Sequence, residues 1–479
     1  MTTLVWFRQD LRLGDHPALR AACAASCADE GHIIPVYIHP AARGGYHEGA
    51  AARWWRHHSL RALTADLTDR GSRLIIRRGE PLTELQQLIR ETGATRVVWH
   101  RRMEPAAREE DSRIKAALRA QGIEVYSFNG NYLHEPWTIL NKQGRPFQVF
   151  TPYWNAVIAA GLDLPPLPAP DTLPAVPETL ASLDIDALEL LPRIPWDRDF
   201  YAEWTPGETG AWERFEDFLP RIDAYAEARD RLVGNGVSRL SPHLHFGEIT
   251  PRQIVSYLLD TRGSVLEPRG IEAYVRELGW REFGAYLAFH FPETVDSPLD
   301  KRFLRFEWRD APDDLRAWQR GQTGIPVVDA AMRCLWHTGW MHNRARMIVA
   351  SFLTKNLLID WRYGAAWFMD TLVDADQPSN TAGWQWTAGT GADAAPYFRI
   401  FNPVLQAEKF DPDGAFIRHW VPELAPLDNR YLYAPWTADA HTLNRAGITL
   451  GKTYPEPIVD LKGSRLRALE RFGQIKQVS

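Results

Sequence analysis

The chain has 479 residues, of which 45% are hydrophobic and 24% are charged, so it can bury a sizeable core in two or three domains. Its formal net charge of -5 gives no bulk attraction to a nucleic acid, so such a partner would need a local basic patch. The sequence has no apolar run of membrane-spanning length, no signal peptide, and three cysteines outside any metal-ligand pattern. We therefore expect a cytoplasmic protein with no membrane partner and no bound metal.

The first 130 residues alternate short apolar runs with amphipathic segments of helical length. This order predicts an α/β domain over residues 1–130, built on a Rossmann-like, doubly wound parallel sheet. No G-x-G-x-x-G follows the first strand, so we expect no dinucleotide in the usual crevice. Strands are predicted at Thr3–Phe7, Ile33–Ile38, Arg73–Arg77, Arg96–Trp99 and Glu124–Ser127.

Residues 131–200 are predicted to connect this domain to an all-α domain over 201–479. The stretch from Gly161 to Trp196 is rich in proline, which favours an extended segment over the surface. Beyond it, strand-like alternation disappears and no internal repeat is present. Helices are predicted over Gly210–Arg231, Pro251–Asp260, Gly270–Phe291, Pro326–Thr338, His342–Leu358 and Ala365–Leu372.

Residues 374–403 combine aspartates, tryptophans and the run FRIFNP. Their glycine, proline, asparagine and aspartate content is typical of a loop, yet large flat side chains would be wasted on an exposed loop. We interpret the segment as a loop that lines a pocket for a planar ligand, with Trp384 and Trp386 offering ring surfaces. The alternative is an irregular core loop held in place by its tryptophans.

Two predicted helices carry faces that suit neither a core nor a solvated surface. Each face mixes an indole with polar side chains at helical spacings of three, four and seven. A salt bridge between Glu277 and Arg281 alone would not require the neighbouring Trp280, so both faces are interpreted as ligand-binding walls. The faces consist of Glu277, Trp280, Arg281 and Gly284, and of Trp340, Asn343, Arg344 and Met347.

Residues 236–242 end in Ser241 before Pro242, a combination typical of an N-cap followed by the first helical residue. The free amides of such a helix, with the hydroxyls of Ser238 and Ser241 and the Arg239 guanidinium, would form a phosphate site. Ordinary capping explains the Ser-Pro pair equally well.

Several long motifs stand in one order along the chain: VWFRQDLRL, ELGWREF, GIPVVDAAMR, GWMHNRARM, LLIDWR and WQWTAGTGADAAPYFRIFNP. Together they resemble the DNA photolyase/cryptochrome family of flavoproteins, most closely the bacterial class I photolyases that act on cyclobutane pyrimidine dimers. The resemblance implies FAD bound by the helical domain, with Asn380 facing the flavin. Val237 stands where relatives more often have threonine, so one hydroxyl contact is missing. The implied FAD contacts are Tyr225, Val237, Ser238, Arg239, Leu240, Ser241, Tyr274, Arg281, Asp374, Asp376 and Asn380.

The family also implies that three tryptophans carry an electron to the flavin, and by motif these match Trp384, Trp361 and Trp308. Indole suits this role because it is oxidised readily and its cation is delocalised. The alternative is that they fill core space, as most of the 20 tryptophans are expected to do.

The resemblance further implies light-driven repair of cyclobutane pyrimidine dimers, in which excited reduced FAD gives an electron to a dimer flipped out of damaged DNA. Repairers of (6-4) lesions carry a paired-histidine pattern and a further histidine in the segment that corresponds to residues 341–347, which read MHNRARM here and lack that further histidine. A cryptochrome-like photoreceptor and a (6-4) photolyase remain alternatives. The implied catalytic residues are Glu277, Trp280, Asn343, Met347 and Trp386, and the implied DNA contacts are Arg229, Glu277, Trp280, Asn343, Arg344, Arg399 and Gln406.

The antenna site departs from the family pattern. Folate-binding relatives carry an Asn-Glu pair where this chain has Ala106 and Ala107. A second chromophore is therefore possible but its identity is left open. We expect the protein to be a monomer.

Overall fold

The computed structural model describes residues 1–29, 31–40, 48–394 and 399–476. They form two compact units whose segments interleave along the chain. The sheet unit consists of residues 1–197, 204–223 and 238–292, and the helical unit consists of residues 198–203, 224–237 and 293–479. The predicted domain limits at 130 and 200 stay a prediction.

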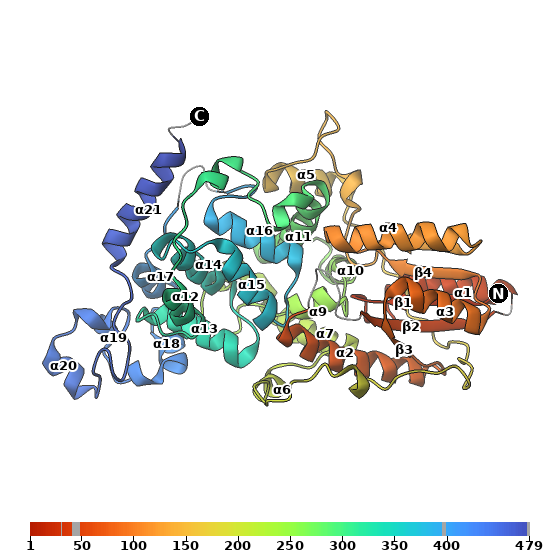
Figure 1. Cartoon of the computed structure of the whole chain (residues 1–479), viewed down its shortest axis with the longest axis horizontal. Coiled ribbons are helices and arrows are strands. Elements are labelled where there is room, and N and C mark those ends of the chain that lie inside the picture. The colour runs from red at the N-terminus through yellow and green to blue at the C-terminus, as the bar shows by residue number, and fades with distance from the viewer. Residues whose placement is uncertain (30, 41–47, 395–398, 477–479) are drawn as a thin grey trace. The chain divides into compact units, whose positions relative to one another are not determined.

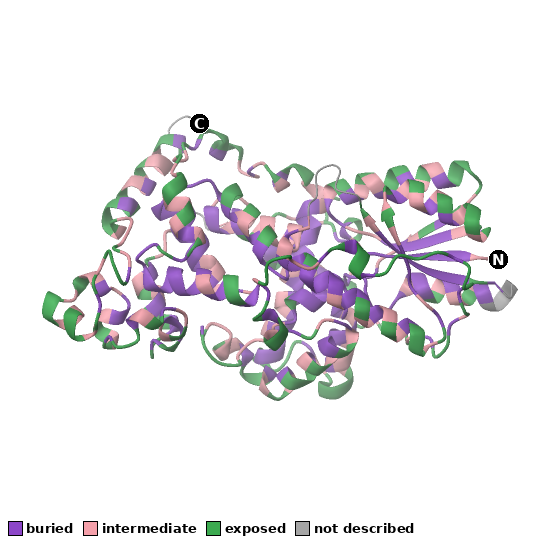
Figure 2. Ribbon diagram, turned by 60° about the horizontal axis from the view of Figure 1, so that its bottom comes forward, coloured by how far each residue is buried: buried purple, intermediate pink, exposed green. Residues whose placement is uncertain are grey.

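The sheet unit is built on a five-stranded parallel sheet in the order β3-β2-β1-β4-β5, which confirms the predicted fold class. The central strands are buried (Figures 1 and 2), as expected when both faces of a parallel sheet are covered. The strands are β1 Thr3–Phe7, β2 Ile33–Pro40, β3 Ile75–Gly79, β4 Arg96–His100 and β5 Glu124–Phe128.

Strand β3 begins two residues later than the predicted Arg73. It is an edge strand, and the proline-rich connector lies along it: Ile76 donates its N–H to Ser182 Oγ at 2.9 Å and accepts from Leu183 N at 3.0 Å. The connector thereby satisfies backbone groups that an open edge would expose. The predicted surface segment thus protects the sheet.

In the sheet unit, helices α3 and α4 pack against the sheet. Their apolar side chains form one core with alternate strand residues such as Trp6, Val97 and Trp99. Alternation arises because successive strand side chains point to opposite faces. The helices are α1 Pro17–Asp29, α2 Ala50–Asp69, α3 Pro81–Thr92, α4 Pro105–Ala120, α5 Phe150–Ala160, α7 Glu208–Phe218, α9 Ser241–Phe246, α10 Pro251–Arg262 and α11 Arg269–His290.

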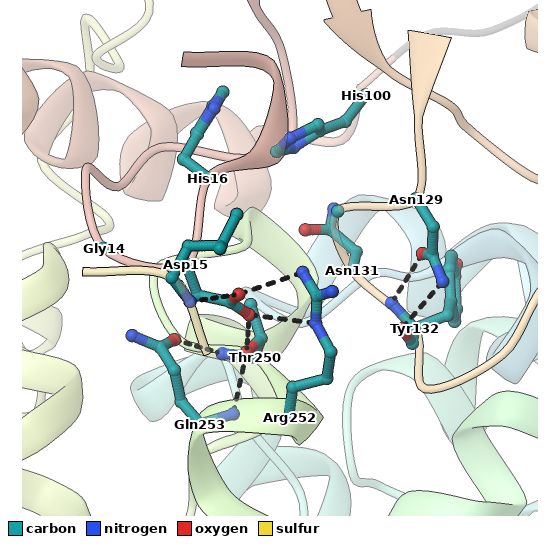
Figure 3. A network of polar contacts seen from close by, with 12 residues as sticks. Gly14, Asp15, His16, His100, Asn129, Asn131, Tyr132, Thr250, Arg252 and Gln253 are labelled. Carbon is teal, nitrogen blue, oxygen red and sulfur yellow. Dashed lines mark hydrogen bonds and ion pairs between the residues drawn. The ribbon is translucent and has the colours of Figure 1, made fainter. Parts of the chain in front are cut away.

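The loop after β1 is fixed to the turn before α10 by buried polar contacts (Figure 3). Arg12 is fully buried and donates to the carbonyl oxygens of Asp15 and Gly247, both at 2.7 Å. Asp15 accepts from Thr250 Oγ1 at 2.7 Å and from Arg252 Nε at 3.1 Å. Buried charges of this kind are tolerated when they are fully hydrogen-bonded, so these contacts order the carboxyl edge of the sheet.

Among its described residues, the helical unit contains ten α-helices after residue 310, together with α6 Phe200–Glu203 and α8 Tyr225–Ala228. In the part of the chain that the structure describes, no helix is long and apolar enough to cross a membrane. The later helices are α12 Pro312–Gln319, α13 Pro326–Thr338, α14 Asn343–Ser351, α15 Trp361–Thr371, α16 Gln377–Ala388, α17 Pro403–Phe410, α18 Ala415–Trp420, α19 Asn429–Leu432, α20 Ala440–Arg445 and α21 Leu461–Lys476.

Two predicted helices are interrupted. The helix predicted over 210–231 is α7, a 3₁₀ segment over Leu219–Ala224 and α8, because Pro220 cannot donate a helical hydrogen bond. The helix predicted over 342–358 is α14 followed by a π-helical segment, Phe352–Asn356, in which Leu357 N–H reaches Phe352 O at 3.0 Å.

The predicted loop at 374–403 is wrong over much of its length, because Gln377–Ala388 is the helix α16. The residues that indicated a loop are those that start a helix. Asp376 is the N-cap and accepts from Ser379 N at 2.9 Å, and Pro378 occupies the first turn. Residues 395–398 of the segment lie outside the described residues.

Candidate functional site

Helix α16 places its two tryptophans on opposite sides. They are two residues apart, which is about 200° around a helix of 3.6 residues per turn. Trp384 is buried, with its ring centroid 5.1 Å from Phe368 and 6.1 Å from Trp318. A Cβ at Gly364 of α15 would overlap the Trp384 ring, so glycine permits this close approach. Trp384 therefore belongs to the interior of the helical unit.

Trp386 is half-buried and lines a hollow. At its base, buried Lys355 donates from Nζ to the carbonyl oxygen of Arg399 at 2.7 Å. Burial, with a smaller effect of the Arg399 charge, lowers the pKa of Lys355 to about 7. The hollow thus offers one indole, the Arg399 guanidinium and an amine whose charge burial disfavours. It is lined by Ser351, Lys355, Trp386, Thr387, Gly389, Arg399 and Phe401.

The other two tryptophans of the predicted electron path also lie in the helical unit. Trp361 is the first residue of α15 and is 2% exposed, whereas Trp308 is half-buried with its ring centroid 4.5 Å from Phe306. Exposure therefore rises from Trp384 and Trp361 to Trp308, as suits a path that ends at the surface. The order of electron steps stays a prediction.

Asp374 and Asp376 have different partners and different roles. Asp374 is buried and its Oδ2 pairs with Arg346 Nη2 at 2.7 Å, while its Oδ1 has no hydrogen-bond partner among the described residues. Asp376 caps α16, and Asn380 donates from Nδ2 to Ala365 O at 3.0 Å. A buried carboxylate oxygen with no partner is costly, and it fits a ligand that supplies an N–H, as a flavin ring does.

Arg346 is a residue that the sequence analysis missed. It holds Asp374 and also donates from Nε to Met341 O at 2.7 Å. Its partner lies 28 residues away in sequence, so helical spacing gives no signal for the pair.

In the sheet unit, Tyr274 and Ser238 come together. The buried Tyr274 hydroxyl donates to Ser238 Oγ at 3.3 Å, and burial raises the pKa of Tyr274 above its ordinary value. Arg239 has a φ of +54°, which is uncommon outside glycine, and its guanidinium lies 4.6 Å from the Trp204 ring centroid. Such constrained backbone is typical of ligand-binding segments.

The predicted N-cap at Ser241 is wrong. Leu240 precedes α9 as its N-cap without a side-chain hydrogen bond, and Ser241 is the exposed first residue of the helix. The Ser241 side chain is therefore one residue too late to cap, because the N-cap residue must lie outside the helical conformation.

Helix α11 carries Glu277 and Trp280, both half-buried. The Trp280 ring stacks on Phe150 with centroids 3.8 Å apart and planes inclined by 8°. Arg281 donates to the carbonyl oxygens of Asn131 at 2.7 Å and Leu244 at 3.0 Å, so its terminal nitrogens hold two segments of backbone.

Glu282, next on α11, was also missed. It is buried and accepts from Leu133 N at 3.0 Å, and burial raises its pKa to about 7. With Arg281 it fixes the chain after β5 to α11.

Helix α14 presents Asn343 as an exposed residue and Met347 as a half-buried one. Arg344 approaches Met347 Sδ at 3.8 Å and pairs with Asp230 at 2.7 Å. The cap of the helix is His342, whose Nδ1 accepts from Arg344 N at 3.1 Å, and burial lowers the pKa of His342 to about 4. The mixed face predicted from the sequence is therefore half-accessible and held by ion pairing.

The remaining predicted residues fall on both units. Arg399 is exposed, Gln406 lies half-buried on α17, and the Arg229 guanidinium stands 5.4 Å from the Tyr225 ring centroid. Tyr225 itself is buried in α8 and Val237 is half-buried. The predicted FAD and lesion residues thus divide between the units, with Ser238 to Ser241, Tyr274, Glu277, Trp280 and Arg281 in the sheet unit.

Asp10, His16 and His100 form a buried cluster that the sequence did not reveal. Asp10 Oδ2 lies 3.1 Å from His16 Nε2 and 3.0 Å from His100 Nδ1. The other ring nitrogens accept backbone N–H groups, His16 from Leu19 at 3.0 Å and His100 from Ala18 at 3.3 Å. Because one nitrogen of each imidazole accepts a backbone N–H, the proton of each ring is on the nitrogen that faces Asp10. That proton occupies the position in which a metal would have to bind. We interpret the cluster as a structural start to α1.

Comparisons with known proteins agree with these features. The family model described as DNA photolyase matches residues 3–171, and the model described as the FAD binding domain of DNA photolyase matches residues 274–474. The chain is 47% identical to the deoxyribodipyrimidine photo-lyase of Agrobacterium fabrum, over 99% of this chain and 98% of that protein. It is 38% identical to cryptochrome-2 of Arabidopsis thaliana, over 97% and 77% respectively.

The crystal structure of a bacterial class III photolyase from Agrobacterium tumefaciens is similar to this chain with a TM-score of 0.95. The sequences are 46% identical, and the match covers 100% of this chain and 98% of that one. FAD binding is thus a property that the sequence predicted correctly.

Proposed function

Because the chain belongs to the DNA photolyase/cryptochrome family, we propose that it repairs cyclobutane pyrimidine dimers in DNA by light-driven electron transfer. The observation that carries the proposal is that the five residues which the resemblance assigns to the lesion are all present and none of them is buried. These residues are Glu277, Trp280, Asn343, Met347 and Trp386.

Bound and reduced FAD supplies the photo-excited electron donor. The residues of the helical unit that would hold it are Asp374, Asp376, Asn380 and Arg346. Asp374 fits this role because its Oδ1 is a buried acceptor with no partner among the described residues. The constrained Arg239 backbone supports a phosphate-binding role for its segment.

The chain's own residues bind and orient the dimer. A dimer leaves the duplex easily because it pairs and stacks badly, and the indoles of Trp280 and Trp386 offer surfaces for its rings. Glu277 and Asn343 can form hydrogen bonds to the pyrimidine carbonyl and N–H groups, which stabilises charge that develops on the dimer. Arg229, Arg344, Arg399 and Gln406 would contact the DNA backbone and give salt-dependent affinity.

The subclass is part of the proposal. The class I assignment from the sequence finds no support in the comparisons, whereas the class III photolyase is similar over the whole chain. We therefore favour class III. A second, antenna chromophore of open identity, and a monomeric cytoplasmic protein, remain parts of the proposal.

The second candidate function is a cryptochrome-like photoreceptor, favoured by the 38% identity to a plant cryptochrome. The test is the absorbance of an oligonucleotide that carries one thymine dimer, mixed with photoreduced protein and followed with and without blue light. Repair predicts light-dependent recovery of thymine absorbance. A flavin that is photoreduced while the dimer persists would contradict repair and favour the photoreceptor.

A parallel oligonucleotide with a (6-4) lesion separates the third alternative. We expect no recovery from this lesion, because the segment 341–347 lacks the additional histidine typical of (6-4) photolyases. Repair of the (6-4) lesion alone would overturn the substrate proposal.

A further inference from the structure

We propose that Phe150 is a positioning residue for lesion recognition, which holds the Trp280 ring in the plane that stacks on a dimer. The inference rests on the proposed function, because it assigns Trp280 to the lesion. Nothing in the sequence motifs marks Phe150, which lies 130 residues before Trp280.

The contact between the two rings is close and parallel. Their centroids are 3.8 Å apart and their planes are inclined by 8°. Phe150 is 0% exposed, whereas Trp280 is half-buried. Since Phe150 covers one face of the indole, the accessible surface of Trp280 is its opposite face and its edges. A planar group that stacks on Trp280 would therefore have to approach the opposite face of the indole.

Phe150 is itself held in its orientation. Trp154, one turn later on α5, is nearly parallel to it at 9° with centroids 6.2 Å apart, and Phe283 meets it edge-on at 5.8 Å and 71°. Gly279 of α11 faces Trp154, where a Cβ would come within 2.5 Å of the indole. The glycine thus lets the two helices approach closely enough for the rings to stack.

A second contact fixes α5 against α11. Arg276 lies one turn before Trp280, its guanidinium stands 5.2 Å from the Phe150 ring centroid, and its Nη2 donates to Thr151 Oγ1 at 3.4 Å. Trp280 therefore rests on a rigid support before any ligand binds. A preordered ring avoids the loss of rotamer freedom that a mobile side chain suffers on binding.

The experiment compares dissociation constants for one oligonucleotide duplex with and without a thymine dimer, in the dark, on FAD-loaded protein. For Phe150→Leu and Phe150→Met, we expect affinity for the dimer to fall about three- to tenfold while affinity for undamaged DNA is unchanged. The matched control is Phe215→Leu. Phe215 is also fully buried in the sheet unit, and its ring packs beside Trp212 and Tyr257 at centroid distances of 6.0 and 5.5 Å.

A double-mutant cycle tests whether Phe150 acts through Trp280. In a Trp280→Leu background, Phe150→Leu should cause no further loss of dimer affinity, because the ring that it positions is absent. An equal loss in both backgrounds would overturn the inference, as would unchanged discrimination in Phe150→Leu and Phe150→Met. Equal weakening on both DNAs would show a merely structural role and overturn it too.

These outcomes are separate from failure of the proposed function. If the wild-type protein binds the dimer no better than undamaged DNA, the proposed function fails and the inference fails with it. If the wild type discriminates and both Phe150 variants discriminate equally, only the inference fails.

Discussion

Helices α11 and α16 each carry a tryptophan proposed to flank the lesion, but they support it in different ways. Trp280 of α11 stacks at 3.8 Å on a buried phenylalanine of another helix, whereas Trp386 of α16 lines a hollow next to buried Lys355. Helix α16 also buries Trp384 on its other side. In the proposed roles, α11 joins lesion recognition to the chemistry through Glu277, while α16 joins recognition to the predicted electron path.

The largest expected effect separates catalysis from recognition on α11. Glu277→Ala should lower the light-dependent repair rate of bound dimer about a hundredfold, because it removes an aligned group that stabilises developing charge. Single-turnover repair measured at saturating protein isolates this effect from binding. Trp280→Leu is the comparison and should weaken dimer binding instead. A Glu277→Ala variant that repairs at the wild-type rate would remove this residue from the chemistry.

The next effect separates the two sides of α16. Trp384→Phe should slow light-driven reduction of oxidised flavin by more than about tenfold, a barrier change of more than about 1.4 kcal/mol, because benzene is harder to oxidise than indole. Flavin absorbance under continuous blue light with an added reductant measures the rate. Trp386→Phe is the matched control and should reduce flavin normally. Equal losses in the two variants would contradict the division of roles.

A smaller effect concerns the start of α16. Asp376→Ala should lower the free energy of unfolding by about 1 kcal/mol, because the carboxylate caps Ser379 N–H. Urea denaturation measures the change, and Asp376→Asn should recover most of it because asparagine also caps helices. If both variants are as stable as the wild type, the cap contributes nothing and Asp376 acts only on a ligand.

A further prediction concerns the pH dependence of stability at α14, which lies outside both helices. His342 caps α14, and its pKa of about 4 lies below the ordinary value of about 6.5. Since the folded state disfavours the proton, the stability it contributes is complete above pH 6.5 and is lost as pH falls toward 4. His342→Asn keeps an acceptor but cannot titrate, so it should flatten the slope of unfolding free energy by up to about 1.4 kcal/mol per pH unit.

If the unfolding free energies of the wild type and His342→Asn change equally with pH, the lowered pKa of His342 is contradicted.

The sequence predicted the elements whose signals are local. The parallel sheet and α13 follow from hydrophobic periodicity, and Pro326–Thr338 has the bounds predicted for it. Helix α16 was missed because Asp376 and Pro378 were interpreted as loop residues, although both also mark the start of a helix. Aspartate and proline are common both in loops and at the start of helices, so only the hydrogen bonds that form in the structure decide between a loop and a helix.

The site was predicted less completely because its contacts are distant in sequence. The resemblance marked Asp374 and Trp280, but their supports, Arg346 and Phe150, carry no local pattern. The pairing of Asp10 with His16 and His100 likewise depends on the order of parallel strands, which brings β1 beside β4. Single-sequence periodicity cannot reveal which remote side chain holds a functional one.

The most direct test is the action spectrum of repair. Fully reduced protein is mixed with a thymine-dimer oligonucleotide, and thymine recovered per incident photon is measured across the near-ultraviolet and blue. The account predicts that recovery follows the absorption of the bound chromophores, which are the reduced flavin and any antenna, and is absent in the dark. Recovery in the dark, or no recovery at any wavelength, would contradict light-driven repair by this protein.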